Sequence, residues 1–136
     1  MIVVDASLLL GRLLGEPASL TAVANATAAA PGQPLQAPEL IELEILQALR
    51  RLLRTGAVSE EQAVDALADL EDTRLERHGH RNLRDGVWQL RHRLTSYDAA
   101  YVVLAERLGA DALLTSDSGM AGVARDVLGP TRVTHV

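Results

Sequence analysis

The sequence contains no cysteine and no lysine, and its aromatic residues are limited to one tryptophan and two tyrosines. The lack of cysteine excludes disulfide frameworks, thiolate zinc sites and cysteine nucleophiles. With no phenylalanine, the core must be built from Leu, Val, Ile and Ala. No apolar run approaches the length of a membrane span, and the start, MIVVDASLLL, lacks the basic segment and cleavage site of a secretory signal. We therefore expect a cytoplasmic protein.

The composition is that of one folded domain. The 136 residues, 48% of them hydrophobic, are enough to bury a substantial core. Because no repeat or low-complexity linker divides them, we expect a single domain over residues 1–136. The formal net charge of −5 argues against a general nucleic-acid-binding surface. All basic residues are arginines, and many of them fall between residues 74 and 93, which makes that stretch either a solvated face or a phosphate-binding one.

Short apolar segments alternate with helical patterns along the chain. Ile2–Val4 and residues 112–115 are apolar runs too short for helices, so both predict buried strands. Gly15 and Pro17 are expected to end the first helix and Ser19 to cap the second, and Ser59 with Gln62 resembles a capping box. Pro38 suits a first helical turn, and Gly56 and Gly109 suit helix ends. Weaker strands are expected at 35–37, 74–77 and 132–135, and helices at 6–14, 19–30, 38–55, 59–70, 82–90, 97–108 and 118–128. This alternation predicts an α/β sandwich around a parallel sheet.

Three aspartates stand next to the predicted strands. Asp5 follows the first strand, Asp117 follows residues 112–115, and Asp98 opens the helix before that strand. Functional groups of an open parallel sheet gather at the carboxyl ends of its strands, so these acids are candidates for one site. Aspartate is also favoured at N-caps and in first helical turns. Each of the three, taken alone, is therefore interpreted more simply as a helix cap.

A fourth acid can come from the long helix in the middle of the chain. Glu42 falls near the apolar stripe of this helix, whereas Glu44 lies on the more polar side with Gln47, Ala48 and Arg51. A carboxylate buried beside a metal would be Glu42, and one that reaches into an open cleft would be Glu44. Helical periodicity leaves both choices open.

Three segments together resemble the PIN-domain family, and more narrowly the VapC-type toxins of bacterial toxin–antitoxin pairs. These segments are VVDAS at the N-terminus, PELIELEILQALRR in the middle, and WQLRHRLTSYDAAYVVLAERLGADALLTSD. They follow the family order over nearly the whole chain. The last segment is the most specific, because it combines Trp88–Arg91 with Tyr97–Ala99 and Thr115–Asp117. The resemblance implies a three-layer α/β/α sandwich with a central, mainly parallel sheet of four to five short strands.

The resemblance also implies four site acids. It places the first at Asp5 in V-D-x-S, the third at Asp98 in Y-D-A, and the fourth at Asp117 in T-x-D. The second falls on Glu44, three residues before Gln47, where asparagine is commoner in the family. These four carboxylates are expected to bind Mg²⁺ or Mn²⁺, directly or through water, as the catalytic and metal-binding residues.

Four carboxylates without histidine or cysteine form a hard oxygen site, which suits Mg²⁺ or Mn²⁺ better than zinc. Without cations the acids repel one another, so we expect raised carboxylate pKa values. A metal ion in this site would activate water and attract the scissile phosphate. Ser7 and Thr115 carry hydroxyls near the acids and are second-tier candidates beside a plain capping role. Arg91 is a further candidate, either for a phosphate contact or for pairing with an acid.

The function implied by the resemblance is that of a metal-dependent endoribonuclease that acts as a toxin. Its implied partners are an RNA substrate, a VapB-type antitoxin and a second copy of the chain in a homodimer. Two alternatives stay open: a housekeeping PIN nuclease that processes RNA, and a non-catalytic interaction module in which the acids are caps. A receiver domain phosphorylated on aspartate is disfavoured, because it would need a lysine near the site and the chain has none.

Overall fold

A five-stranded, all-parallel sheet forms the centre of the structure, a computed structural model that describes residues 1–136. Each pair of neighbouring strands runs in the same direction. The order across the sheet is β3-β2-β1-β4-β5, and the bounds are β1 (Ile2–Val4), β2 (Leu35–Pro38), β3 (Leu75–His78), β4 (Ala112–Thr115) and β5 (Val133–His135). The mainly parallel sheet expected from the sequence is therefore confirmed.

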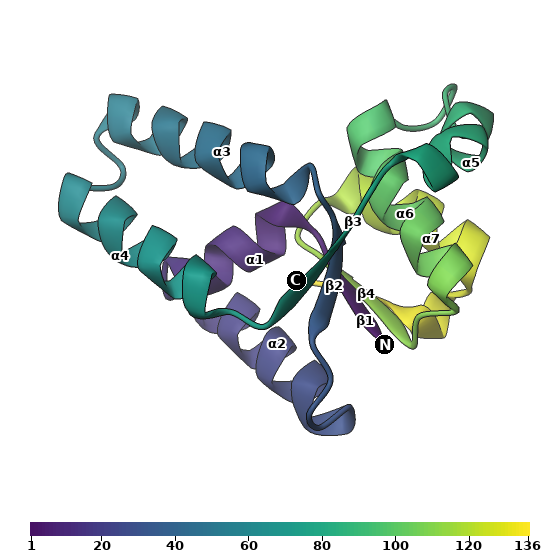
Figure 1. The fold of residues 1–136 in the computed structure, drawn as a ribbon, viewed down its shortest axis with the longest axis horizontal. Coiled ribbons are helices and arrows are strands. Elements are labelled where there is room, and N and C mark those ends of the chain that lie inside the picture. Colours follow the sequence, from purple (N-terminus) through teal and green to yellow (C-terminus); the bar gives the residue numbers. More distant parts are fainter.

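Helices cover both faces of this sheet (Figure 1). One face carries α1 (Ala6–Leu13), α2 (Pro17–Ala29), α3 (Ile41–Thr55) and α4 (Glu60–Asp72), and the other carries α5 (Arg84–Gln89), α6 (Ser96–Leu108) and α7 (Ser118–Leu128). Two short 3₁₀ turns, Arg81–Leu83 and Pro130–Arg132, complete the chain. The three layers agree with the predicted sandwich. None of the helices combines the length and apolar character needed to cross a bilayer.

The chain changes direction across the sheet between β1 and β4. From β1 it moves outward through β2 to β3, with its helices on one face, and it then returns through α5 and α6 to β4 beside β1. From β4 it moves outward the other way, to β5. Right-handed crossovers place the two sets of helices on opposite faces. The gap between the carboxyl ends of β1 and β4 is therefore the switch point where such folds hold their ligands.

Helix ends follow the expected local chemistry. Ser59 and Gln62 form the predicted capping box at the start of α4. Gly56 and Gly109 take left-handed conformations at the C-caps of α3 and α6, with φ of 75° and 57°. Such angles favour glycine because it lacks a Cβ atom.

Two helix starts differ from the sequence prediction. The first helix ends before Gly15 and Pro17 as expected, but Pro17 also begins α2, and Ser19, expected as the cap of that helix, is buried within it. Proline fits this place because its fixed φ suits a helix and its missing N–H is not needed. Pro38, expected in the first turn of α3, instead ends β2. The amides of Leu35 and Glu39 bond to β3, so the nitrogen of Pro38 faces β1, where pairing has already ended.

The core is one aliphatic cluster of 32 buried residues, and Tyr101 is the only aromatic residue in it. The expectation of an aliphatic interior is thus confirmed. Trp88 and Tyr97, the other two aromatic residues, lie at the surface.

Close packing of α5 on α6 depends on Gly86. A Cβ atom at this residue would lie 2.7 Å from Cγ1 of Val103, a buried residue of α6. Gly122 in α7 provides a matched contrast, because a Cβ atom there would meet nothing within 4 Å.

We predict that Gly86→Ala lowers the free energy of unfolding by about 1–3 kcal/mol, because the added methyl group overpacks the contact with Val103. Gly122→Ala should raise it by about 0.5–1 kcal/mol, because alanine has the higher helix propensity. Urea unfolding followed by circular dichroism measures both. Equal stabilisation by the two substitutions would contradict the packing of α5 on α6.

Candidate metal and catalytic site

Asp5 and Asp117 lie on either side of the switch point, and both cap helices. The carboxylate of Asp5 accepts a hydrogen bond of 2.9 Å from the amide of Leu8 in α1. The carboxylate of Asp117 accepts one of 2.7 Å from the amide of Met120 in α7. The capping interpretation is correct for these two residues. Each accepts its backbone amide through a single oxygen, Oδ1, so capping uses only one of the two carboxylate oxygens.

All four acids suggested by the resemblance line one cavity of about 250 Å³. Asp5 and Asp117 enter it from the ends of β1 and β4, Glu44 from α3, and Asp98 from the first turn of α6. Asp98 is not the cap of its helix, because Thr95 takes that role and accepts the amide of Asp98 at 3.2 Å. Four separate elements therefore direct carboxylates toward one space at the carboxyl edge of the sheet.

The structure distinguishes Glu44 from Glu42. Glu44 lines the cavity, and its Oε1 accepts a hydrogen bond of 2.6 Å from the hydroxyl of Tyr101. Glu42 forms an ion pair with Arg77 of β3 and does not line the cavity. Helical periodicity left open which side of α3 faces the site. In the structure it is the polar side, and this side faces the three aspartates of the cavity.

Two hydroxyls fix the carboxylate of Asp5, which is only 2% exposed. Thr115 donates to it at 2.7 Å, and Ser7 donates to both of its oxygens at 2.9 Å. The same hydroxyls accept backbone amides from the loop after β4: Thr115 from Asp117 at 2.9 Å, and Ser7 from Ser116 at 3.2 Å. These two residues therefore tie the position of Asp5 to that of the loop that carries Asp117.

Burial is the main cause that raises the carboxyl pKa values of Asp5, Glu44 and Asp98, and the repulsion expected from the sequence adds to it. The pKa of Asp5 is raised by burial, against the opposing effect of its hydrogen bonds. Burial also raises the pKa of Glu44, with further contributions from the charges of Asp98 and Asp5. The pKa of Asp98 rises through burial and the nearby charge of Asp117. Burial, with a smaller contribution from repulsion among the acids, thus favours protonation or a bound cation.

Arg91 and the arginine-rich stretch do not line this cavity. The guanidinium of Arg91 lies 4.7 Å from the centre of the Trp88 ring and donates to the carbonyl of Trp88. It makes no ion pair with an acid. Arg77 and Arg93 are paired with Glu42 and Asp126. The arginines from 74 to 93 are thus divided among several elements, and two of them are paired with acids.

Two residues of the site were missed by the sequence analysis. Tyr101 holds Glu44 from within the core, one helical turn after Asp98. Arg51 is the only basic residue that lines the cavity, and it lies two turns after Glu44 on α3. Helical spacing carried the signal for both, since residues three, four and seven apart share one face.

The donor set fits a hard divalent cation. No group of three or more acidic or histidine side chains is arranged to hold one ion directly, so the four carboxylates do not form a closed cage. Mg²⁺ does not need such a cage, because it usually keeps several waters and takes one or two carboxylates together with substrate phosphates. Asp5, Glu44, Asp98 and Asp117 suit this open arrangement, in which some contacts pass through water.

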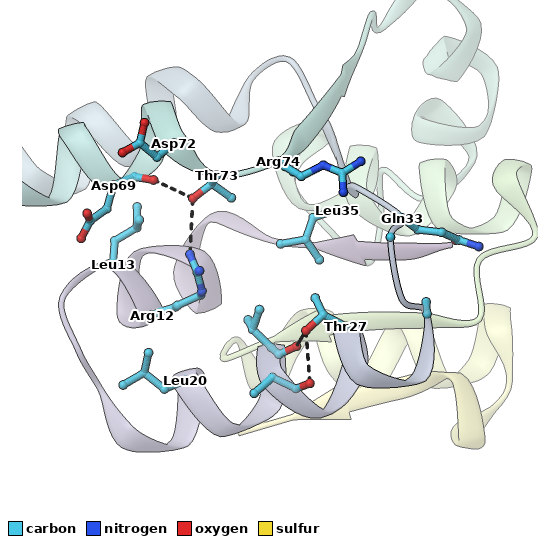
Figure 2. Close-up of a pocket in the computed structure, with 14 residues that line it drawn as sticks. Arg12, Leu13, Leu20, Thr27, Gln33, Leu35, Asp69, Asp72, Thr73 and Arg74 are labelled. Atoms are coloured by element: carbon cyan, nitrogen blue, oxygen red, sulfur yellow. Dashed lines mark hydrogen bonds between the residues drawn. The ribbon is translucent and has the colours of Figure 1, made fainter.

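A different cavity of about 750 Å³ lies at the opposite, amino end of the strands, between α1, α2 and α4 (Figure 2). There Arg12 donates to the hydroxyl of Thr73, which donates to the carbonyl of Asp69. These bonds join the ends of α1 and α4. Only two acids, Asp69 and Asp72, line this cavity, in contrast to the four at the carboxyl edge.

Comparison with known proteins identifies the family to which the chain belongs. The family model described as PIN domain matches residues 2–126. The chain therefore belongs to the PIN-domain family.

Its relatives include ribonucleases of the VapC type. Ribonuclease VapC1 of Mycobacterium tuberculosis is 41% identical over 122 residues, which cover 88% of this chain and 87% of that protein. Ribonuclease VapC9 of the same species is 38% identical over 86% of each chain. Ribonuclease VapC12 is 31% identical over 89% of this chain and 90% of its own.

The raised pKa values predict how the stability of the metal-free protein depends on pH. In the folded protein the pKa values of Asp5, Glu44 and Asp98 lie above their ordinary values of 3.8, 4.5 and 3.8. These carboxylates therefore bind protons more tightly in the folded state than in the unfolded chain. The unfolded chain therefore releases these protons first, and the free energy of unfolding falls as pH rises from about 4 through the raised values. Thermal unfolding in EDTA should show a lower melting temperature at pH 7.5 than at pH 4.5, because this range begins near the unfolded pKa values.

Asp98→Asn serves as the internal control for that measurement, since it removes one of the repelling charges. It should raise the melting temperature at pH 7.5 and flatten the pH dependence. A melting temperature that rises with pH in the wild type, or a variant less stable than the wild type at pH 7.5, would contradict the repulsion among the acids.

Proposed function

We propose that the protein is a VapC-type endoribonuclease that acts as the toxin of a toxin–antitoxin pair. The observation that carries the proposal is the cavity at the switch point, where four carboxylates from four elements meet. The identity to VapC ribonucleases over most of both chains supports the same function. On this proposal residues 1–136 act as one PIN domain, and cleavage of cellular RNA takes place in the cytoplasm.

Asp5, Glu44, Asp98 and Asp117 are the residues that would hold Mg²⁺ or Mn²⁺, directly or through water. When bound, the ion would activate water and stabilise negative charge on the scissile phosphate. The chain itself supplies position: Ser7 and Thr115 hold Asp5, and Tyr101 holds Glu44.

Arg51 supplies a positive charge at the mouth of the cavity. It is exposed, and no acid pairs with it. We assign it to a phosphate of the RNA beside the cleaved bond, because arginine suits bidentate phosphate contacts. In this role the positive charge of Arg51 would offset part of the repulsion between the four carboxylates and the RNA phosphates.

Protein partners are the second part of the proposal. Helices α3 and α4 expose the large apolar side chains Leu43, Leu46, Val64 and Leu67. Exposed apolar groups that gather on neighbouring helices mark protein-binding surfaces. We therefore assign this helix pair to protein contacts, with a VapB-type antitoxin as the partner, and expect a homodimer of the toxin.

RNA cleavage by the purified protein tests the catalytic proposal. We expect cleavage with Mn²⁺ or Mg²⁺ and none in EDTA. Asp5→Asn, Glu44→Gln and Asp98→Asn should each lower the rate by more than about 100-fold, which exceeds the usual cost of losing an outer partner of a metal site. Gel analysis of labelled RNA with time provides the rates.

Glu42→Gln is the matched control, because it changes an acid on the same helix that does not line the cavity. It removes only a surface ion pair, worth about 0–1 kcal/mol of stability, and should leave the cleavage rate unchanged. If Glu42→Gln and Glu44→Gln lose activity equally, the assignment of the site to this cavity is wrong.

Growth of a bacterial host tests the toxin role separately. Induced expression of the wild type should arrest growth, and the inactive Asp5→Asn variant should not. Co-expression of a short neighbouring antitoxin gene should restore growth. RNA cleavage in vitro without growth arrest would favour the alternative of a housekeeping PIN nuclease.

A further inference from the structure

A second cavity opens at the same carboxyl edge of the sheet, with a volume of about 800 Å³. Its walls come from the loops after β2 and β3, from α5 and from the first turn of α6. We call it the aromatic cavity, because Trp88 and Tyr97 line it together with Leu40, His80, Arg81 and Arg84. Nothing in the cleavage site described above uses these residues.

Both aromatic rings are unusually accessible. Trp88 is 65% exposed and Tyr97 is 66% exposed. The whole chain has only three aromatic residues, and only Tyr101 belongs to the core. Two of three aromatic side chains therefore contribute little to packing and stand at the wall of one cavity, where a flat ligand can stack on them.

The Trp88 ring is held in place before any ligand arrives. The guanidinium of Arg91 lies 4.7 Å from the ring centre, and Arg91 does not line the cavity. Gly86 allows α5, which carries Trp88, to pack closely on α6, which carries Tyr97. His80 accepts the amide of Leu40 at 3.1 Å and so joins the loops after β2 and β3. Because these contacts already order the walls of the cavity, the protein would lose little conformational entropy when a ligand binds there.

The charge of this cavity is opposite to that of the acidic cavity. Arg81 and Arg84 line it, neither forms an ion pair, and Asp85 is the only acid among the lining residues. A ligand that suits it has a flat ring and a negative charge. A nucleotide with an unpaired base has both, because such bases stack on aromatic side chains while their phosphates contact arginine.

The two cavities are neighbours along one edge. The strand order β3-β2-β1-β4 places the aromatic cavity over the ends of β3 and β2, and the acidic cavity over β1 and β4. They share the first turn of α6, where Tyr97 lines one and Asp98, the next residue, lines the other. One turn later Ala100 lines the aromatic cavity and Tyr101 lines the acidic one. The start of α6 is therefore a wall that the two cavities share, and a strand of RNA that crosses it would reach both.

We propose that the aromatic cavity is a subsite for an unpaired base next to the cleaved phosphodiester bond. The base stacks on Trp88 and Tyr97, and its phosphate contacts Arg81 and Arg84. The inference rests on the proposed ribonuclease function for the identity of the polymer. It assigns to these four residues a role in the choice of where the RNA is cut.

Because Trp88 is the only tryptophan in the chain, its fluorescence reports directly on stacking. The wild-type protein is titrated in EDTA, which prevents cleavage, with a mixed-sequence single-stranded RNA hexanucleotide. An abasic ribose-phosphate chain of the same length is the matched ligand. We expect the RNA to quench the fluorescence and the abasic chain, which has the charge but no rings, to leave it almost unchanged.

Binding of a labelled hexanucleotide, followed by fluorescence anisotropy, tests the residues. Trp88→Ala should weaken binding roughly 5- to 100-fold, the range expected for one lost stacking contact, and Trp88→Phe should retain most of the affinity. Arg81→Gln should weaken binding and reduce its dependence on salt. Arg107→Gln, on the exposed end of α6 away from both cavities, should do so less.

The outcomes separate this inference from the proposed function. Equal binding by wild type and Trp88→Ala, with no quenching, would overturn the subsite even if Mn²⁺-dependent cleavage is observed. Base-dependent quenching without any cleavage would support the subsite and refute the nuclease. Fluorescence that changes with protein concentration alone, in step with dimer formation in sedimentation, would show that a second copy covers the aromatic cavity, and would also overturn the inference.

Discussion

The carboxylate of Asp5 is buried directly after the central strand β1. The hydrogen bonds around it compensate part of the free energy that this burial costs. Burial of a charge is unfavourable unless hydrogen bonds or an opposite charge compensate it. Ser7, Thr115 and the amide of Leu8 supply hydrogen bonds, yet the pKa of Asp5 stays raised. With Glu44 and Asp98 also at raised pKa values, a divalent cation bound there would offset the unfavourable negative charge. The proposed catalytic role would thus explain why buried acids that lower the stability of the metal-free protein are gathered at one place.

The core and the site are physically connected through a few residues. Tyr101 packs its ring among aliphatic side chains and uses its hydroxyl to hold Glu44. Thr115, at the end of β4, bonds to Asp5 and to the amide of Asp117. Strand pairing between β1 and β4 therefore sets the spacing of two acids, and packing of α6 against the sheet sets the other two. The same edge of the sheet continues into the aromatic cavity. On our proposals, RNA cleavage and the choice of where the RNA is cut therefore depend on the same strands and on the start of α6.

Much of this arrangement could be predicted from the sequence, because its signals are local. Short apolar runs predicted β1 and β4, and helix-end residues such as Gly56 and Gly109 predicted where helices stop. Asp5 and Asp117 could be placed because they directly follow strands. The choice of Glu44 over Glu42 needed the resemblance or the structure, since it depends on which side of α3 faces α6. The start of α2 was placed too late because Ser19 suits a cap but is buried in the helix that Pro17 begins. Pro38 was misplaced because proline suits both a helix start and a strand end, and only tertiary pairing decides between them.

The central claim is that the four-carboxylate cavity binds the catalytic cation, and a crystal soaked in Mn²⁺ tests it most directly. An anomalous difference map collected near the manganese edge shows the metal independently of any cleavage assay. The account predicts a peak inside the cavity, within direct or water-mediated reach of Asp5, Glu44, Asp98 and Asp117, and its loss in Asp98→Asn. A cavity without a peak in protein that cleaves RNA with Mn²⁺, or a peak only at a distant site, would contradict the account.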